Sequence, residues 1–442
     1  MTDSVTGTIM DHPSHDAPAP VPFSLLGGPG SRLLAGPAQS SGPEDLSSHL
    51  ARLGPLELDA VDPELLRRQI RESGLLGRGG AGFPTATKLD AAAAAGGDPL
   101  IVVNASEGEP ASRKDHVITH YRPHLVLDGA YLAARSVGAR EIVIYGHGPL
   151  DTTPSPLERA LAQRSVDGVS VRLVNAPQGY VAGETSAVVS FLEGRGAIPR
   201  RRALPAAREG VAGRPTVVNN AETVAHLALI GRFGASWFHE AGAPEAPGST
   251  LVTLAGEVAR PGTVVEVTGP CSFGEVIGHW GDVGSPRAVL LGGYEGTWLP
   301  WSVIRDLPVE RHRLAAQGVS LGCGVVAVVS SASCGLGETG RLLWWLSSQS
   351  AGQCGPCING LPRLAAQFDD LLDGRLRRRD LKSMRLLLSS LRGRGDCGHP
   401  TGVVTLVESA LDTFDEELTR HLRGETCTPR PSRGFPLPGE ER

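Results

Sequence analysis

The chain has 442 residues, 57 of them glycine, and a formal net charge of −5. The acidic balance argues against a general nucleic-acid-binding protein, and no apolar run reaches the ~18–20 residues of a membrane span. The polar N-terminus lacks the basic-then-apolar order of a signal peptide. Seven cysteines suit an intracellular metal or redox site better than a secreted disulfide framework. We therefore expect a soluble, cytoplasmic protein.

Elements are predicted in chain order as follows. Residues 1–58 are rich in proline and are expected to form a partly ordered arm. Asp62 can cap a helix with Pro63 in its first turn, and Gly74 can end it. Apolar β-branched runs then alternate with helical stretches, which predicts βαβ units and a parallel sheet. The expected strands are 100–104, 141–145 and 169–174, and the expected helices are 123–137 and 154–164.

The second half of the chain changes character. Short strands, Gly/Pro turns and one helix at 272–280 predict a small α+β unit over 249–300. From about residue 338 the pattern is helical, with apolar residues at helical spacing. The expected helices are 339–348, 361–372, 380–391 and 405–422. The last fifteen residues are expected to form a tail.

A glycine-rich loop follows the first helix. Gly77, Gly79 and Gly82 fit the G-x-G-x-x-G dinucleotide fingerprint literally, but that fingerprint requires a preceding strand and here a helix comes first. Such a loop is either a mobile surface loop or a cradle whose backbone N–H groups approach a phosphate or a flat ring. Lys88 closes the loop, and lysine is rare in this chain, so we favour the cradle.

Three further clusters of small and polar residues lie at 104–110, 179–186 and 219–223. Each alone could be a turn or a helix cap. The chain has only three lysines and five asparagines, for which nucleotide bias in the genome is the simplest cause. Two of the lysines and three of the asparagines nevertheless fall in or beside these clusters and the glycine loop. The first cluster also follows a buried strand, where α/β sheets bind ligands. We therefore predict a cofactor pocket.

The cysteines divide into two groups. Cys354 and Cys357 have the two-residue spacing of a metal chelate or a redox dithiol, and Cys397 is the natural third ligand. A thioredoxin-type dithiol is disfavoured because a helical stretch precedes the pair. Unlinked buried thiols are the alternative, and an iron–sulfur cluster would need a fourth ligand. The remaining thiols are expected to be structural: Cys271, Cys323, Cys334 and Cys427.

Taken together, these motifs resemble the NADH-oxidising flavoprotein (51-kDa) subunit of respiratory complex I and its relatives in soluble hydrogenases and formate dehydrogenases. The resemblance runs from about residue 62 to 425 and implies an α/β fold. It predicts an arm over 1–58, a Rossmann-like FMN-binding domain over 59–246, a β-grasp domain and linker over 247–335, a helical iron–sulfur domain over 336–425 and a tail over 426–442.

The resemblance also implies the cofactors FMN, NAD(H) and a [4Fe–4S] cluster. It implies that the flavin is surrounded by Arg78, Gly79, Gly80, Gly82, Lys88, Asn104, Glu107, Tyr180, Gly183, Glu184, Asn219, Asn220 and Thr223. Phe83 and Glu109 match nicotinamide-nucleotide contacts. Catalytic roles are assigned to Lys88 and Glu107, and metal ligation to Cys354, Cys357 and Cys397.

The implied function is hydride transfer from NAD(P)H to FMN, followed by single-electron transfer to an iron–sulfur centre or a partner, as in an NADH dehydrogenase (quinone). The expected partner is a redox subunit or a ferredoxin, with no nucleic acid and no membrane span, in the cytoplasm or peripheral on the inner face of the cell membrane. The alternatives are a degenerate paralogue that acts as a binding or assembly module, and a flavoprotein reduced by ferredoxin.

This chain departs from the family pattern at several positions. The first cysteine of the cluster motif is replaced by Ala351, which cannot bind iron. Three options remain: a cluster with an outside fourth ligand, a three-iron cluster, or no stable cluster. Ser350, His399 and Cys334 are the candidates for an outside ligand.

Ser106 stands where the family carries Asp, and Thr185 where a second Glu is usual. Aromatic residues that clamp the nucleotide are missing around Ala91 and Leu204. The sequence therefore matches the family pattern better at the flavin pocket than at the residues that clamp NADH.

A basic stretch lies in the last third of the chain. Residues 375–394 hold eight basic residues and one acidic residue, Asp380. Most such runs are solvated helix faces. The alternative is a docking surface for an acidic redox partner.

Overall fold

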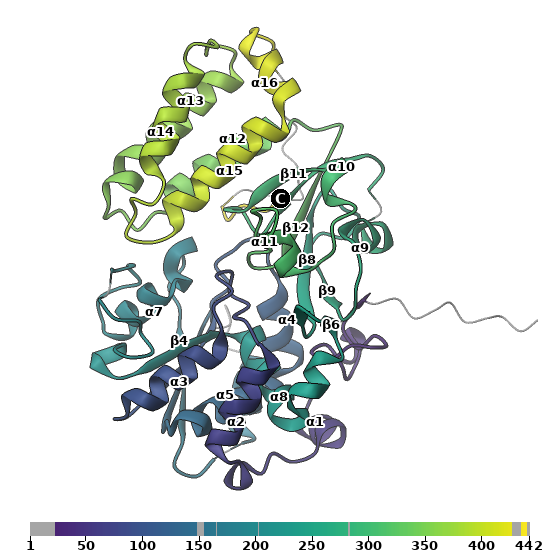
Figure 1. The fold of residues 1–442 in the computed structure, drawn as a ribbon, viewed down its shortest axis with the longest axis vertical. Helices are drawn as coiled ribbons and strands as arrows, with labels where there is room; N and C mark the ends of the chain where they lie inside the picture. The colour runs from purple at the N-terminus through teal and green to yellow at the C-terminus, as the bar shows by residue number, and fades with distance from the viewer. Residues whose placement is uncertain are drawn as a thin grey trace, which may run out of the picture.

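The computed structural model describes residues 23–147, 154–164, 166–201, 203–281, 283–426 and 435–439. Two large sheets and a helical bundle make up these residues (Figure 1). The bundle lies at the top of the view, the mixed sheet below it at the right, and the parallel sheet with its helices at the bottom. Among the described helices, none combines the length and the apolar character that crossing a membrane requires.

The first sheet has four parallel strands in the order β4–β3–β2–β5. Their bounds are β2 Leu100–Ala105, β3 Glu141–Gly146, β4 Ser170–Asn175 and β5 Thr216–Asn220. The chain winds outward from β2 through β3 to β4, and then returns to place β5 on the other side of β2. Such a reversal opens a ligand crevice at the carboxyl ends of the two strands that flank it. The predicted α/β parallel sheet is confirmed, with β5 as a strand that the sequence pattern did not reveal.

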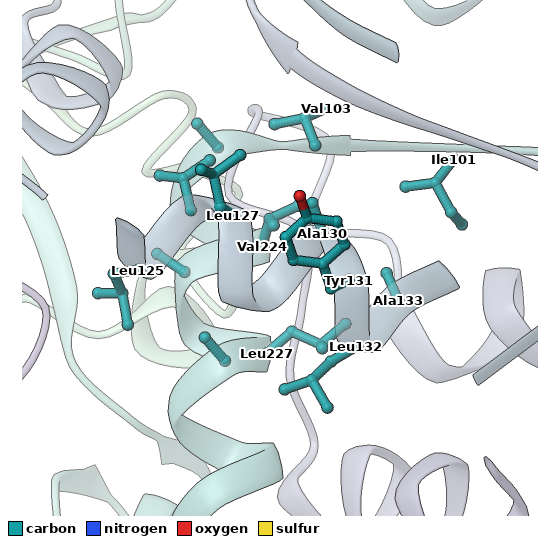
Figure 2. Packing of buried hydrophobic residues seen from close by; sticks show 14 of the residues in the cluster. Ile101, Val103, Leu125, Leu127, Ala130, Tyr131, Leu132, Ala133, Val224 and Leu227 are labelled. Atoms are coloured by element: carbon teal, nitrogen blue, oxygen red, sulfur yellow. The ribbon is translucent and has the colours of Figure 1, made fainter. Parts of the chain in front are cut away.

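Helices cover both faces of this sheet. One face carries α2 Pro63–Ser73, α3 Thr85–Ala95, α5 Pro123–Val137 and α8 Ala221–His239. Figure 2 shows side chains of α5, such as Leu127 and Tyr131, between strand β2 and helix α8. The other face packs against α7, Thr185–Leu192. The remaining helices of this half are α1 Leu46–Leu53, α4 Lys114–Tyr121 and α6 Pro156–Ala162.

Helices α5 and α8 pack closely against each other at a glycine. A Cβ built on Gly129 of α5 would lie 1.9 Å from the carbonyl oxygen of Val224 in α8. Any side chain there would push the two helices apart, because packed cores have no spare volume.

The second sheet is mixed, with six strands in the order β1–β9–β8–β12–β10–β11. Its strands are β1 Phe23–Ser24, β8 Thr250–Gly256, β9 Thr263–Val267, β10 Pro286–Leu291, β11 Thr297–Pro300 and β12 Val325–Ser330. The pair β8–β12 is parallel and the other pairs are antiparallel. Helix α9, Phe273–Trp280, packs its Phe273, Val276 and Ile277 on this sheet. Two further short helices contribute Ile304 and Leu314 to the same core, and the β-grasp assignment of this unit stays a prediction. Shorter elements complete it: β6 Gly242–Ala243, β7 Ala246–Pro247, α10 Trp301–Ile304 and α11 Arg311–Ala315.

The helical bundle consists of α12 Gly335–Ser348, α13 Leu361–Leu372, α14 Leu381–Leu391, α15 His399–Thr413 and α16 Asp415–Leu422. The prediction of one helix over 405–422 is wrong in two ways. Helix α15 starts earlier because Pro400 suits a first helical turn. The chain then breaks at the buried Phe414, and α16 begins with acidic residues, which helix N-termini favour.

The described part of the N-terminal arm, residues 23–58, packs on the mixed sheet and on the helices of the parallel sheet, where the Arg122 guanidinium donates to the carbonyls of residues 34, 35 and 37. Strand β1 joins the edge of the mixed sheet beside β9. The buried carboxylate of Glu266 accepts the backbone N–H groups of Arg32, Leu33 and Leu34 at 2.9–3.0 Å. Residues 1–22 lie outside the described residues. The predicted domain borders after 58, 246, 335 and 425 stay predictions.

Candidate functional site

A cavity of about 670 Å³ opens at the carboxyl ends of β2 and β5, in the crevice that the strand order creates. Its size is within the ~300–1,000 Å³ of small-molecule sites. The predicted cofactor residues that line it are Gly79, Gly80, Gly82, Phe83, Lys88, Asn104, Glu107, Glu109, Tyr180, Gly183, Glu184, Asn219 and Asn220. Segments separated widely in the sequence therefore converge here as predicted.

Helix α2 ends at Gly74, and the glycine loop closes back on itself before α3 begins. The N–H of Gly77 donates to the carbonyl of Phe83 at 2.8 Å, and the N–H of Thr85 donates to Leu75 at 2.9 Å. Gly80 and Gly82 have φ of 112° and 63°, a region that other residues rarely adopt. The loop therefore needs its glycines and leaves backbone facing the cavity.

Lys88 reaches the cavity from α3. Its Nζ donates to the carbonyl of Val218 at 2.9 Å and to Oδ1 of Asn219 at 3.3 Å. No carboxylate among the described residues lies within ion-pairing distance of this group. Burial lowers the pKa of Lys88, because the charged form loses solvation. A half-buried cation without a carboxylate partner suits an anionic ligand.

A second lysine, Lys114, holds the wall beside Asn220 in place. Its Nζ donates to Asp115 Oδ1 and to Asn220 Oδ1, both at 2.9 Å, and lies 3.2 Å from Glu222. Asn220 also caps α8 through the N–H of Glu222. Sequence reasoning did not assign Lys114 and Asp115 to the site, although Lys114 carried the signal of a rare lysine next to a polar cluster.

Glu107 is one of two non-glycine residues with positive φ in the described part of the chain, at 39°. Its carboxylate accepts the N–H groups of Asp115 and His116 at the start of α4, and the hydroxyl of Ser112. Burial and the nearby Asp115 raise the pKa of Glu107 to about 6. Both carboxylate oxygens of Glu107 therefore accept hydrogen bonds from the start of α4 or from Ser112, which precedes it. The catalytic role of Glu107 stays a prediction.

Asn104 and Gly183 join two of the predicted clusters. The amide of Asn104 donates to the carbonyl of Gly183 at 2.7 Å, and its Oδ1 accepts the N–H and hydroxyl of Ser106. A Cβ on Gly183 would lie 2.6 Å from the Ser106 hydroxyl. The serine that replaces the family's aspartate therefore has a packing partner as well as a hydrogen bond.

Glu109 and Tyr180 lie deeper in the cavity, with Phe83 at its edge. The Tyr180 hydroxyl donates to Glu109 at 3.2 Å, and the N–H groups of Tyr294 and Ala111 also donate to this carboxylate. Burial is the main reason that the pKa of Glu109 rises to about 7. The ring of Phe83 is 49% exposed, which leaves a free aromatic face for a flat ligand. Glu184 is the N-cap of α7.

Two predicted flavin residues do not line this cavity. The guanidinium of Arg78 turns toward the mixed sheet and donates to Thr250 Oγ1 and the Ser249 carbonyl, both at 3.1 Å. Thr223 is buried and accepts the backbone N–H of Arg78 at 2.9 Å. These two residues therefore hold the glycine loop on its side away from the main cavity.

The mixed sheet and the bundle contribute cavity walls that sequence reasoning missed. These residues are Gly292, Glu295, Ser320, Gly322, Cys323, Gly398 and His399. They come from other structural units than the predicted clusters, so no local pattern marked them. Cys323, which we expected to be only structural, lines the cavity.

The three predicted metal ligands occupy one region of the bundle. Cys354 precedes a π-helical turn, Pro356–Gly360, which contains Cys357. Burial and the neighbouring Cys354 raise the pKa of Cys357 to about 12. Cys397 lies on the wall of the main cavity. Within the described residues, however, no group of three or more His, Cys, Asp or Glu is arranged to hold a metal ion. Metal ligation by these thiols stays a prediction.

The basic stretch 375–394 includes α14 and carries much of its charge in ion pairs. Arg375 pairs with Asp370 and Asp373, Arg385 with Asp412 and Arg392 with Glu408. These acidic partners offset the charge excess that the stretch has in the sequence.

Two family models match the chain in the predicted order. The Nuo51 FMN-binding domain matches residues 70–229, and the NADH-ubiquinone oxidoreductase-F iron–sulfur binding region matches residues 328–421. With the parallel sheet and its cavity, these matches define the class of protein as a flavoprotein electron-transfer subunit.

Sequence relatives and a solved structure identify the family within that class. The F subunit of the NADH-quinone oxidoreductase of Mycobacterium bovis is 31% identical over 378 residues, which are 81% of this chain and 84% of the relative. The second F subunit of the Rhizobium meliloti enzyme is 29% identical over 389 residues, 84% of this chain and 91% of the relative. The chain belongs to the family of NADH-quinone oxidoreductase F subunits. A crystal structure of an NAD+-reducing [NiFe]-hydrogenase in the H2-reduced state matches with a TM-score of 0.75 and 29% identity, over 84% of this chain and 66% of that chain.

Proposed function

We propose that this chain is an oxidoreductase subunit that binds FMN in the main cavity, takes reducing equivalents from NAD(P)H and passes electrons to a partner. The observation that supports this most directly is the crevice beside β2 and β5, where the glycine loop meets the amino group of Lys88, which has only neutral hydrogen-bond acceptors among the described residues. FMN, when bound, supplies the chemistry: it accepts a hydride and releases the electrons one at a time.

The residues present fit FMN. The glycine loop offers backbone at which a ring or phosphate can approach closely, since Gly80 and Gly82 carry no side chain into the cavity. Lys88 and the asparagine amides supply donors for an electron-rich ring and its phosphate. The role assigned to Lys88 is to stabilise negative charge on the ligand without itself transferring a proton.

The residues present do not fit a cluster held by four cysteines. Such a cluster needs four ligands, and Ala351 occupies the first ligand position of the motif. The motif itself supplies three thiols, those of Cys354, Cys357 and Cys397, out of the six free thiols of the described residues. We therefore derive no electron-transfer step through a cluster.

The expected partner is a redox subunit or a ferredoxin, and the expected location is the cytoplasm or the inner face of the cell membrane. Relatives are named as subunits of an NADH-quinone oxidoreductase. The paired arginines of 375–394 make an electrostatic docking surface there weaker than the sequence alone suggests. An association rate that does not change with salt would contradict docking by this stretch.

The experiment is an anaerobic spectrum of the protein after incubation with FMN and removal of free flavin, before and after one equivalent of NADH. Bound flavin that NADH bleaches supports the proposal. Flavin that only reduced ferredoxin or a chemical reductant bleaches contradicts NADH as donor, and a protein that takes up neither FMN nor iron would indicate a binding module.

Two lysine variants make this test residue-specific. Lys88→Met should weaken FMN binding by about tenfold or more, since a charge-assisted contact contributes ~1.5–3 kcal/mol. Lys382→Met removes an exposed lysine from α14 and should bind FMN like the parent. Equal FMN affinity in both variants would contradict the placement of the cofactor beside Lys88.

A further inference from the structure

A second cavity, of about 460 Å³, borders the glycine loop. It shares residues 80–82 and Ser320 with the main cavity, but its other walls include the β6–β7 hairpin, helix α11, Thr250 of β8 and Val267 of β9. The proposed function does not use it. Its apolar lining includes Leu76, Val309 and Leu321.

Two guanidinium groups, of Arg78 and Arg311, line this cavity. Arg78 is only 4% exposed, and its two terminal nitrogens donate to Thr250 and Ser249. Arg311 donates through both terminal nitrogens to the single carbonyl of Gly322, at 3.3 Å each. The Nε atom of each arginine is buried and has no hydrogen-bond partner.

Neither arginine has a carboxylate within ion-pairing distance among the described residues. Burial and the charge of Arg311 lower the pKa of Arg78 to about 10, and burial lowers that of Arg311. The charge of Glu222 acts in the opposite direction and raises the pKa of both arginines. Its carboxylate, however, forms an ion pair with Lys114 at 3.2 Å. Buried arginines are normally paired, because an isolated buried charge is costly.

The other charged groups of the cavity do not neutralise these arginines. Glu310 and Glu245 lie 3.5 and 3.9 Å from Nε2 of His312. These three groups form a separate cluster in the lining. The cavity thus combines an apolar wall with two guanidinium groups, of buried Arg78 and half-buried Arg311, neither of which has a carboxylate in ion-pairing distance, and it holds the carboxylates of Glu245 and Glu310 apart from them at His312.

We propose that this second cavity binds a small organic anion, a carboxylate or a phosphate monoester, with its charged head at Arg78 and Arg311 and its apolar part against Leu76, Val309 and Leu321. Guanidinium groups bind both kinds of head group through paired N–H donors. The unpartnered Nε atoms supply donors for it.

The test uses the FMN-loaded protein, so that the main cavity is filled, in a low-salt buffer free of phosphate and carboxylate. Inorganic phosphate and butyrate are titrated separately by calorimetry, and the stronger probe identifies the head group. We expect one probe to bind at one site per chain. Arg311→Gln should weaken that binding about tenfold or more, whereas Arg305→Gln, which removes an exposed arginine paired with Asp306, should leave it unchanged.

A second variant guards against misfolding of Arg311→Gln. Ala315→Phe narrows the cavity from α11 without removing a charge, and should reduce binding of butyrate while FMN stays bound. Absence of binding by both probes at millimolar concentration would overturn the proposal. So would parent-like binding in Arg311→Gln, or in Ala315→Phe if Arg311→Gln does not fold.

Discussion

The hydroxyl of Tyr180 donates a hydrogen bond to the Glu109 carboxylate at 3.2 Å. Glu109 follows strand β2, and Tyr180 precedes helix α7. The mixed sheet contributes the N–H of Tyr294 to the same carboxylate, and Trp345 of the bundle meets the Tyr180 ring edge-on at 5.6 Å. The parallel-sheet half, the mixed sheet and the bundle therefore meet at this hydrogen bond, which explains why Glu109 is desolvated.

The raised pKa of Glu109, about 7 instead of 4.5, predicts a pH dependence of stability. Between these values the folded protein binds a proton that the unfolded chain has released, so this contribution is complete below pH 4.5 and is lost as pH rises through 7. Glu109→Gln should remove it. Between pH 5 and 8 the unfolding free energy of the parent should fall by roughly 1–3 kcal/mol more than that of the variant.

Denaturant unfolding of the flavin-free protein at several pH values measures this difference. Other buried groups titrate equally in both proteins and cancel in the comparison. Parallel curves for parent and variant would show that Glu109 is not protonated above its usual range.

Lys88 is predicted to affect the redox potential of bound FMN. A half-buried cation at the flavin favours its negatively charged reduced form, so Lys88→Met should make the two-electron midpoint potential more negative, by about 30 mV for each ~1.4 kcal/mol lost. Spectroelectrochemical titration measures it, with Lys382→Met as the control. An unchanged potential in a Lys88→Met protein that still holds FMN would argue against this role.

Ala351 is predicted to limit iron binding. After anaerobic reconstitution, Ala351→Cys should bind about four irons per chain, as a [4Fe–4S] cluster with four thiolates does, while the parent should bind fewer. Iron and sulfide analysis and the visible spectrum measure the outcome, with Ala351→Ser as the control without a thiol. A full cluster in the parent would mean that a ligand other than residue 351 completes it.

The same substitution is predicted to have opposite effects in two helices. Gly129→Ala should destabilise the protein by roughly 2–4 kcal/mol, because the added Cβ collides with the Val224 carbonyl. Gly278→Ala in α9 meets no atom within 4 Å and should stabilise by about 0.5–1 kcal/mol, as alanine favours a helix. Thermal and denaturant unfolding compare the two. A neutral Gly129→Ala would show that α5 and α8 can separate without cost.

Much of the fold follows from local sequence. Asp62, Pro63 and Gly74 mark the ends of α2 because capping uses hydrogen bonds within one turn. The serines and glutamates of two capping boxes start α6 and α9 in the same way. The split of the last helix at Phe414 was not predicted, because it depends on where a buried ring packs.

The residues of the candidate cavity also fall into those that local sequence predicts and those that depend on tertiary packing. The glycine loop, Lys88 and the asparagines were recognisable from residue type and spacing, since each cluster is contiguous in the chain. The replacement of the motif's first cysteine by Ala351 was also recognisable directly from the sequence. The direction of the Arg78 side chain, the capping of α4 by Glu107 and the cavity walls from Glu295 and Cys323 were not. Those features depend on how the mixed sheet and the bundle pack against the parallel sheet, and contacts between residues so far apart in the chain leave no local pattern.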